Sequence, residues 1–135
     1  MAKGLLRKML QDRKDILVVS AGVAALPGFR PTRETIEVMA KHGIDVSAHL
    51  TQRLTNQMVE EADLIFVMER IHKQEILNRV PSAKKKVFLL CEYADTVPGP
   101  SVEIEIPDPI AKPMDVYESC FCIIQEAVEK VVKKL

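Results

Sequence analysis

Five consecutive apolar residues, Leu64-Ile65-Phe66-Val67-Met68, form the strongest strand signal in the chain. A strand that is apolar at every position needs cover on both faces, as in a parallel sheet that lies between two layers of helices. Residues 16–19 and 87–90 are two further short apolar runs, and both predict buried strands. The chain is therefore predicted to be an α/β protein, with a three-layer parallel sheet, helices on both faces and three visible strands.

Helical periodicity occupies the segments around these runs. Apolar residues recur at helical spacing over 1–11, 32–42, 55–62, 69–80 and from 114 to the carboxyl end. Thr32 and Thr55 stand where an N-cap is expected, and Gly43 and Pro81 mark helix ends. Strands that alternate with helices are typical of a doubly wound sheet, whose ligand site lies beyond the carboxyl ends of the strands.

The charge balance argues against several classes of partner. The 135 residues include 19 basic and 19 acidic ones, so no overall field favours nucleic acid or an anionic membrane, and any anion site must be local. No apolar run is long enough for a membrane span, and the first residues lack the pattern of a signal peptide. The length fits a single domain over 1–135.

The three cysteines are Cys91, Cys120 and Cys122. An odd number of scattered cysteines favours a reducing cytoplasm over a disulfide framework, and all three are expected to be packing residues. No spacing of histidine and cysteine matches a zinc site, so neither a metal nor a cofactor is expected.

Asp108 stands between two prolines in Ile106-Pro107-Asp108-Pro109, within a proline-rich connection over 92–112. Each proline fixes its own φ and pushes the preceding residue toward an extended conformation, so the Asp108 backbone has little freedom. On this spacing alone, a turn whose carboxylate accepts hydrogen bonds from local amides is the preferred interpretation. The alternative is a carboxyl group held in place for proton transfer.

Several segments, taken in order, resemble the low-molecular-weight protein tyrosine phosphatase family. The matching segments are 1–7, which resembles the start of the family's first helix, 20–22 at the end of its second strand, 42–49 after its second helix, 62–68 as its third strand, and 106–109 as the loop with its general acid. The resemblance implies hydrolysis of phosphomonoesters through a cysteinyl-phosphate intermediate, with Asp108 as the catalytic acid. It also implies two substrate-binding residues, Ser20 as a hydroxyl near the phosphate and Ile110 in the pocket wall, where the family usually has an aromatic side chain.

The chain departs from the family at the residues that carry the chemistry. In the family, a cysteine and an arginine separated by five residues cradle the phosphate on a loop between the first strand and the first helix. The last arginine here is Arg79, which precedes every cysteine, so the sequence contains no such pair. We therefore expect that the chain starts after this loop, lacks the central first strand and is inactive by itself. Lys3 also stands where the family usually has an acidic residue.

Three functions stay open at this point. The chain is a tyrosine or arginine phosphatase of this family, or a catalytically dead binding module of the same fold, or an unrelated flavodoxin-like regulator, for which no acidic cluster is visible at strand ends. The expected partner is a phosphorylated protein or a small anion bound weakly near the start of the first helix. A missing central strand would leave backbone groups unpaired, so we expect either that residues 16–20 pair with 63–68 or that a homodimer completes the sheet.

Overall fold

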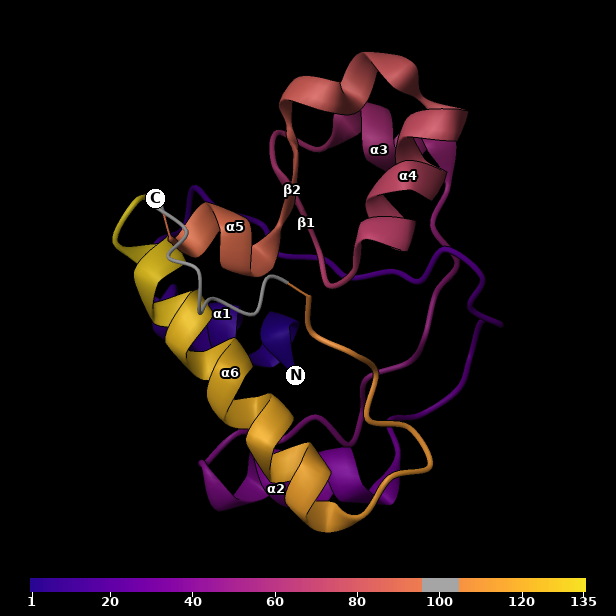
Figure 1. Ribbon diagram of the computed structural model, residues 1–135. Helices are drawn as coiled ribbons and strands as arrows, with labels where there is room; N and C mark the ends of the chain where they lie inside the picture. The colour runs from indigo at the N-terminus through magenta and orange to yellow at the C-terminus, as the bar shows by residue number, and fades with distance from the viewer. Residues whose placement is uncertain (96–104) are drawn as a thin grey trace.

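The computed structural model describes residues 1–95 and 105–135 (Figure 1). Its elements in chain order are α1 (Ala2–Met9), α2 (Arg33–Lys41), α3 (Asn56–Glu61), β1 (Ile65–Val67), α4 (Arg70–Arg79), η1 (Pro81–Lys85), β2 (Val87–Leu89), α5 (Leu90–Ala94) and α6 (Met114–Val132). All five predicted helices are present. Of the predicted connection over 92–112, α5 takes the beginning, and 96–104 lie outside the described residues.

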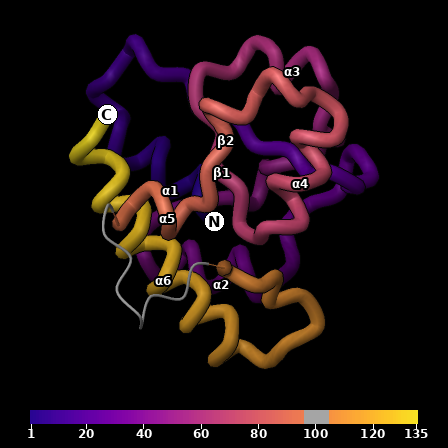
Figure 2. The backbone as a smooth tube through the Cα atoms, turned by 45° about the horizontal axis from the view of Figure 1, so that its top comes forward, coloured from indigo at the N-terminus to yellow at the C-terminus, as the bar shows by residue number. Residues whose placement is uncertain are grey.

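Strands β1 and β2 pair in parallel, with Ile65 opposite Val87 and Val67 opposite Leu89. Successive residues of β1 face opposite ways, as strand geometry requires. Val67 packs in a cluster with residues of α3, α4 and η1, whereas Phe66 packs against the cluster built from α1, α2, α5 and α6. Figure 2 shows the strands between these two groups of helices. The prediction of a parallel sheet with helices on both faces is therefore confirmed.

The predicted third strand is not found among the described residues, where the only ladder joins β1 to β2. Residues 16–20 are irregular, and they do not pair with 63–68. Leu17 is 84% exposed and Val19 is 56% exposed, whereas Ile16 and Val18 are half-buried and pack against the larger core, so only one side of this run is covered. A strand needs a neighbour with which to exchange backbone hydrogen bonds, and the nearest approach to a ladder is a single parallel bridge between Gly22 and Arg53. Completion of the sheet by a homodimer stays a prediction.

Helix α6 organises the larger of the two cores. Its buried stripe follows helical spacing and consists of Tyr117, Cys120, Phe121, Ile124, Ala127, Val128 and Val131. This stripe covers Leu5, Leu6 and Leu10 of the α1 segment, together with the buried residues of α2 and α5. The ring of Phe121 stacks on His42, with centroids 4.0 Å apart. The apolar periodicity of the last helix was thus a sound guide to its buried face.

Local capping fixes where α2 and α3 begin. The Thr32 hydroxyl accepts a hydrogen bond from the Thr35 amide at 3.3 Å, and the Thr55 hydroxyl accepts one from the Met58 amide at 3.1 Å. Both predicted N-caps are therefore confirmed. Gly43 has a φ of +73° just after α2, a conformation that glycine adopts at little cost, and it turns the chain into the segment that borders the site.

Candidate functional site

A cleft of about 1060 Å³ lies beyond the carboxyl end of β1. One wall is the exposed side of α1, and another is the segment 43–50. Met68 and Glu69, which directly follow β1, line the cleft together with the Pro-Asp-Pro turn and the first half of α6. A position at the carboxyl end of a parallel strand is where ligand sites of α/β sheets are expected.

The structure brings the three residues singled out from the sequence into this one cleft. Ser20, Asp108 and Ile110 all line it, although Ser20 is 88 positions before Asp108 in the sequence. Ser20 is half-buried, and its hydroxyl forms no hydrogen bond with a described residue. Its carbonyl accepts a hydrogen bond of 2.8 Å from the Gln52 amide side chain, which holds this part of the backbone at the cleft edge.

Two hydrogen bonds anchor the Pro-Asp-Pro turn to the sheet and to α4. The Ile106 amide donates to the Met68 carbonyl at 2.9 Å, and the Ile106 side chain is buried. One residue earlier, the Glu105 carboxylate accepts a hydrogen bond of 2.8 Å from the Arg70 amide in the first turn of α4. A carboxylate at this position also suits the dipole of α4. The turn therefore starts from a fixed point at the end of β1.

The Asp108 carboxylate is exposed, and its Oδ1 accepts a hydrogen bond of 3.0 Å from the Ile110 amide. The turn interpretation is therefore correct for one carboxylate oxygen. Oδ2 has no hydrogen-bond partner among the described residues. A carboxyl group with one oxygen fixed and the other open to a cleft can give a proton to a bound group or take one from it. Ile110 is 60% exposed, so it presents an apolar rim and not an aromatic wall.

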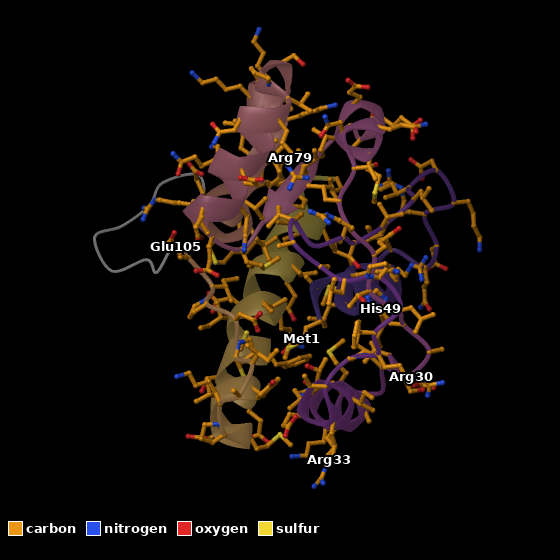
Figure 3. All side chains as sticks on the ribbon, turned by 90° about the vertical axis from the view of Figure 1, so that its right-hand side faces the viewer. Met1, Arg30, Arg33, His49, Arg79 and Glu105 are labelled. Carbon is orange, nitrogen blue, oxygen red and sulfur yellow. The ribbon has the colours of Figure 1, made fainter. Side chains whose placement is uncertain are left out.

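His49 and Lys3, neither of which was expected to bind substrate, also line the cleft. The His49 ring is half-buried, and its Nδ1 lies 3.4 Å from Nζ of Lys3. Burial lowers the pKa of His49, and the positive charges of Lys3, the α-amino group and Arg7 lower it further. In Figure 3, Met1 lies between α6 and α2, and His49 lies beside α1. Because the two partners are 46 positions apart, no local pattern could have linked them.

A second histidine in the cleft has a structural role. His72 lines the same cleft, but its Nδ1 accepts a hydrogen bond of 3.3 Å from the Glu69 amide in a capping box at the start of α4. This arrangement satisfies backbone donors at the helix N-terminus. His72 is therefore a capping residue of α4.

Cys120 lies in the cleft wall, yet its surroundings oppose a nucleophilic role. The residue is buried, and burial raises the pKa of its thiol; the α-amino group counteracts this shift, and Asp108 adds to it. A reactive cysteine needs the opposite shift, toward the thiolate. Arg7 also lines the cleft but is exposed, and no interaction joins it to Cys120 in the described part of the chain. Of the three expected packing cysteines, Cys91 and Cys120 are buried and Cys122 is exposed, which corrects that prediction.

Residues 1–95 and 105–135 contain neither a metal-binding cluster nor a helix that could span a membrane. No group of three or more histidine, cysteine, aspartate or glutamate side chains is placed to hold a metal ion. No helix in the same residues has both the length and the apolar character that crossing a bilayer demands.

Comparison with protein families gives one match over the whole chain. The model of the family described as "Low molecular weight phosphotyrosine protein phosphatase" matches residues 1–135. A protein of Ralstonia solanacearum, "Probable low molecular weight protein-tyrosine-phosphatase EpsP", is 39% identical over 135 residues, which are 100% of this chain and 86% of that protein. The "Protein-arginine-phosphatase" of Bacillus subtilis (strain 168) is 29% identical over 136 residues, covering 100% of this chain and 87% of that protein.

Solved structures agree with the sequence comparisons. The Vibrio vulnificus protein Wzb, whose structure was solved in complex with benzylphosphonate, superposes with a TM-score of 0.85 at 30% identity. The superposition covers 99% of this chain and 88% of that one.

Proposed function

Since the chain belongs to the low molecular weight phosphotyrosine protein phosphatase family, we propose that its cleft receives the phosphorylated side chain of a protein. The observation that carries this proposal is the meeting of Ser20, Asp108 and Ile110 in one cleft at the carboxyl end of β1. In this arrangement the Ser20 hydroxyl binds a phosphate oxygen, Ile110 contacts the apolar part of the substrate, and Asp108 lies beside the bridging oxygen, where a general acid acts once a nucleophile is supplied. A cytoplasmic setting is part of the same proposal and is supported by the odd number and scattered positions of the three cysteines, which do not suit a disulfide framework.

The 135-residue chain is proposed to bind this group without hydrolysing it. Hydrolysis through a phosphoenzyme needs an activated nucleophile and a cation that holds the equatorial oxygens. No arginine occurs anywhere after the first cysteine in the sequence, so a Cys-x5-Arg motif is absent. Burial also raises the pKa of the Cys120 thiol. This supports a domain in which an acid and a binding wall are present but the nucleophile and the phosphate clamp are not.

The first experiment separates binding from turnover. The chain is assayed with p-nitrophenyl phosphate, for which we expect no turnover above background. It is then titrated with benzylphosphonate, the ligand of the Vibrio vulnificus relative, while backbone amides are followed by NMR. We expect shifts at Ser20, Asp108 and Ile110. Measurable turnover would refute the inactive assignment, and unchanged amides would refute the binding site.

The second experiment tests the role of Asp108 as an acid. A segment that supplies a strand and a Cys-x5-Arg loop is joined to the amino terminus, and turnover of p-nitrophenyl phosphate is expected to appear. In that fusion, Asp108→Asn should lower kcat by a factor of about 10² to 10⁴, the usual contribution of a general acid. Asp63→Asn is the matched control, because Asp63 is exposed and does not line the cleft. Equal rates for the two variants would remove Asp108 from the mechanism.

A phosphorylated arginine is the second candidate substrate. The Ile110 side chain is apolar but not aromatic, so this wall offers no ring to stack on a phosphotyrosine. One relative is named as an arginine phosphatase, which is the reason to compare phosphoarginine with phosphotyrosine. Competition between phosphotyrosine and phosphoarginine peptides for the benzylphosphonate site would decide between the two substrates.

A further inference from the structure

The α1 wall of the cleft carries positive charge that the proposed phosphate site does not use. Lys3 and Arg7 are four residues apart on α1, which places them on the same side of the helix. His49 reaches Lys3 from the segment 43–50, and all three residues line the cleft. The cleft therefore contains basic groups along α1 as well as the acidic side chains of Asp108 and Glu69.

These cations have no acidic partner in the described part of the chain. No ion pair includes Lys3 or Arg7, although seven ion pairs form elsewhere. Asp45 also lines the cleft, but its Oδ1 accepts hydrogen bonds from the amide and the hydroxyl of Ser47, at 2.9 and 2.6 Å. Lys8, the remaining lysine of α1 that lines the cleft, donates to the His42 carbonyl at 2.9 Å.

The contact between Lys3 and His49 leaves a donor for a ligand. A lysine ammonium group has only protons to donate, so a hydrogen bond between charged Lys3 and His49 requires a neutral ring in which Nδ1 is the acceptor. The proton then sits on Nε2, which can donate to an anion. Burial and then the charge of Arg7 lower the pKa of Lys3. Burial also lowers the pKa of His49, and the charges of Lys3, the α-amino group and Arg7 lower it further. An anion placed between these groups would relieve their mutual repulsion.

We propose that Lys3, Arg7 and His49 form a second anion-binding subsite in the cleft wall, which selects phosphorylated peptides that carry a further acidic group near the phosphorylated residue. This inference rests on the proposed function, because it assigns the preferred substrate class of the same cleft. The extra acidic group, a carboxylate or a second phosphate, lies along α1 while the phosphorylated side chain points toward Asp108.

Two peptides that share a non-hydrolysable phosphonate analogue of phosphotyrosine test the subsite. One has two glutamates beside the analogue and the other has two glutamines, and binding is followed by fluorescence anisotropy. We expect the acidic peptide to bind about fivefold more tightly at low salt, as two partly exposed charge pairs would provide. This preference should shrink as ionic strength rises. Binding of the acidic peptide should also raise the NMR titration midpoint of His49, a change that a purely structural role would not produce.

Single-charge variants locate the effect. Lys3→Gln and Arg7→Gln should each reduce the preference for the acidic peptide to less than about twofold. Lys84→Gln is the matched control, because it removes the same charge from an exposed position on η1 that does not line the cleft. A loss of preference in the Lys84 variant as large as in the other two would refute a local subsite. Circular dichroism confirms that each variant is folded.

The outcomes distinguish this inference from the proposed function. Equal binding of the two peptides by the unaltered chain would overturn the second subsite and leave the phosphate site intact. If neither peptide binds, the proposed function fails, and the inference fails with it. If the acidic peptide binds more tightly but the His49 titration midpoint does not change, His49 is not part of the subsite, and the assignment of the subsite to these three residues is overturned.

Discussion

Two apolar runs of similar composition adopt different structures in this protein, one as a paired strand and the other as an irregular segment. Residues 64–68 provide β1, where Val67 is 6% exposed and faces a core of α3 and α4 residues. Residues 16–19 also contain isoleucine, leucine and two valines, yet they form no strand: Leu17 is 84% exposed, and only Ile16 and Val18 pack against the larger core. An apolar, β-branched run is therefore only a candidate strand. It becomes a strand when another strand is available to pair with it and helices cover it.

The two runs are also attached to the rest of the molecule in different ways. The run at β1 has a parallel ladder with β2. The first run is held before its start by Arg13, which donates to the Leu135 carbonyl at 3.1 Å, and at its end by the Gln52 hydrogen bond to Ser20. Between them, Ile16 and Val18 pack against the larger core. Just beyond it, Arg79 donates to the carbonyls of Val23 and Leu54 at 2.9 and 3.3 Å. Figure 3 shows Arg79 in the space between α4 and α3. Side-chain contacts therefore hold this segment in place, whereas a backbone hydrogen-bonded ladder holds β1.

The largest expected contrast comes from placing the same charge in each run. Val67→Asp buries a carboxylate without a partner and should destabilise the fold by more than about 3 kcal/mol, or prevent folding. Leu17→Asp places the same group in solvent and should change the stability by less than about 0.5 kcal/mol. Urea unfolding followed by circular dichroism measures both.

A large loss of stability in the Leu17→Asp variant would contradict an exposed first run. Sedimentation of the unaltered chain tests whether that run is covered by a second copy. If a homodimer completes the sheet, as the sequence suggested, Leu17→Asp should convert it to a monomer.

The next effect tests whether Arg79 fastens the chain beyond the first run. Arg79→Ala removes charged hydrogen bonds to two carbonyl groups and should lower the free energy of unfolding by about 2 kcal/mol. Arg33→Ala is the control, because Arg33 is 86% exposed and pairs only with Glu37 across one helical turn. Its cost should stay below about 0.5 kcal/mol. Equal costs for the two variants would remove Arg79 as a tether.

A smaller effect is expected from Gln52→Ala. The variant loses one hydrogen bond of 2.8 Å to the Ser20 carbonyl, worth about 0.5 to 1 kcal/mol. Hydrogen exchange at residues 16–22 should accelerate, while exchange in β1 stays unchanged. Gln57→Ala, which removes an exposed contact with Glu61, is the matched control. Faster exchange in β1 would show that the two runs are coupled and not separately held.

The smallest effect concerns the carboxyl group just before the first run. The Arg13 guanidinium, through its hydrogen bond, lowers the pKa of Asp15 to about 2. An unfolded aspartate titrates near 3.9, so the folded state favours the charged form. The contribution of this pair is complete above about pH 4 and is lost as the pH falls through the folded pKa. Arg13→Gln should return the Asp15 midpoint to its ordinary range in a carbon-13 NMR titration. A midpoint that stays near 2 would show that Arg13 is not the cause.

The sequence was most informative where the physical signal is local. Thr32 and Thr55 were recognised as caps because a side-chain oxygen bonds an amide three residues later in both cases. The buried stripe of α6 followed from apolar spacing alone. The position of Asp108 was predicted only in part. The prolines implied a constrained backbone around the carboxylate, and the structure added the hydrogen bond from the Ile106 amide to the Met68 carbonyl that fixes the turn.

The contact between Lys3 and His49 was beyond reach of the sequence, because two segments 46 positions apart create it. The sequence also did not show that residues 16–19 would remain without a strand partner. Their composition is that of a strand, but strand pairing is a property of two segments and is decided when the chain is folded.

Sequence patterns alone predicted helices α1, α2, α3, α4 and α6, the two threonine caps and the constrained turn around Asp108, because each depends on residues within a few positions of one another. Only the tertiary structure decided which apolar run joined the sheet and which side chains share the cleft. Both are set by the energy of packing and hydrogen bonding between distant segments, which no single stretch of sequence contains.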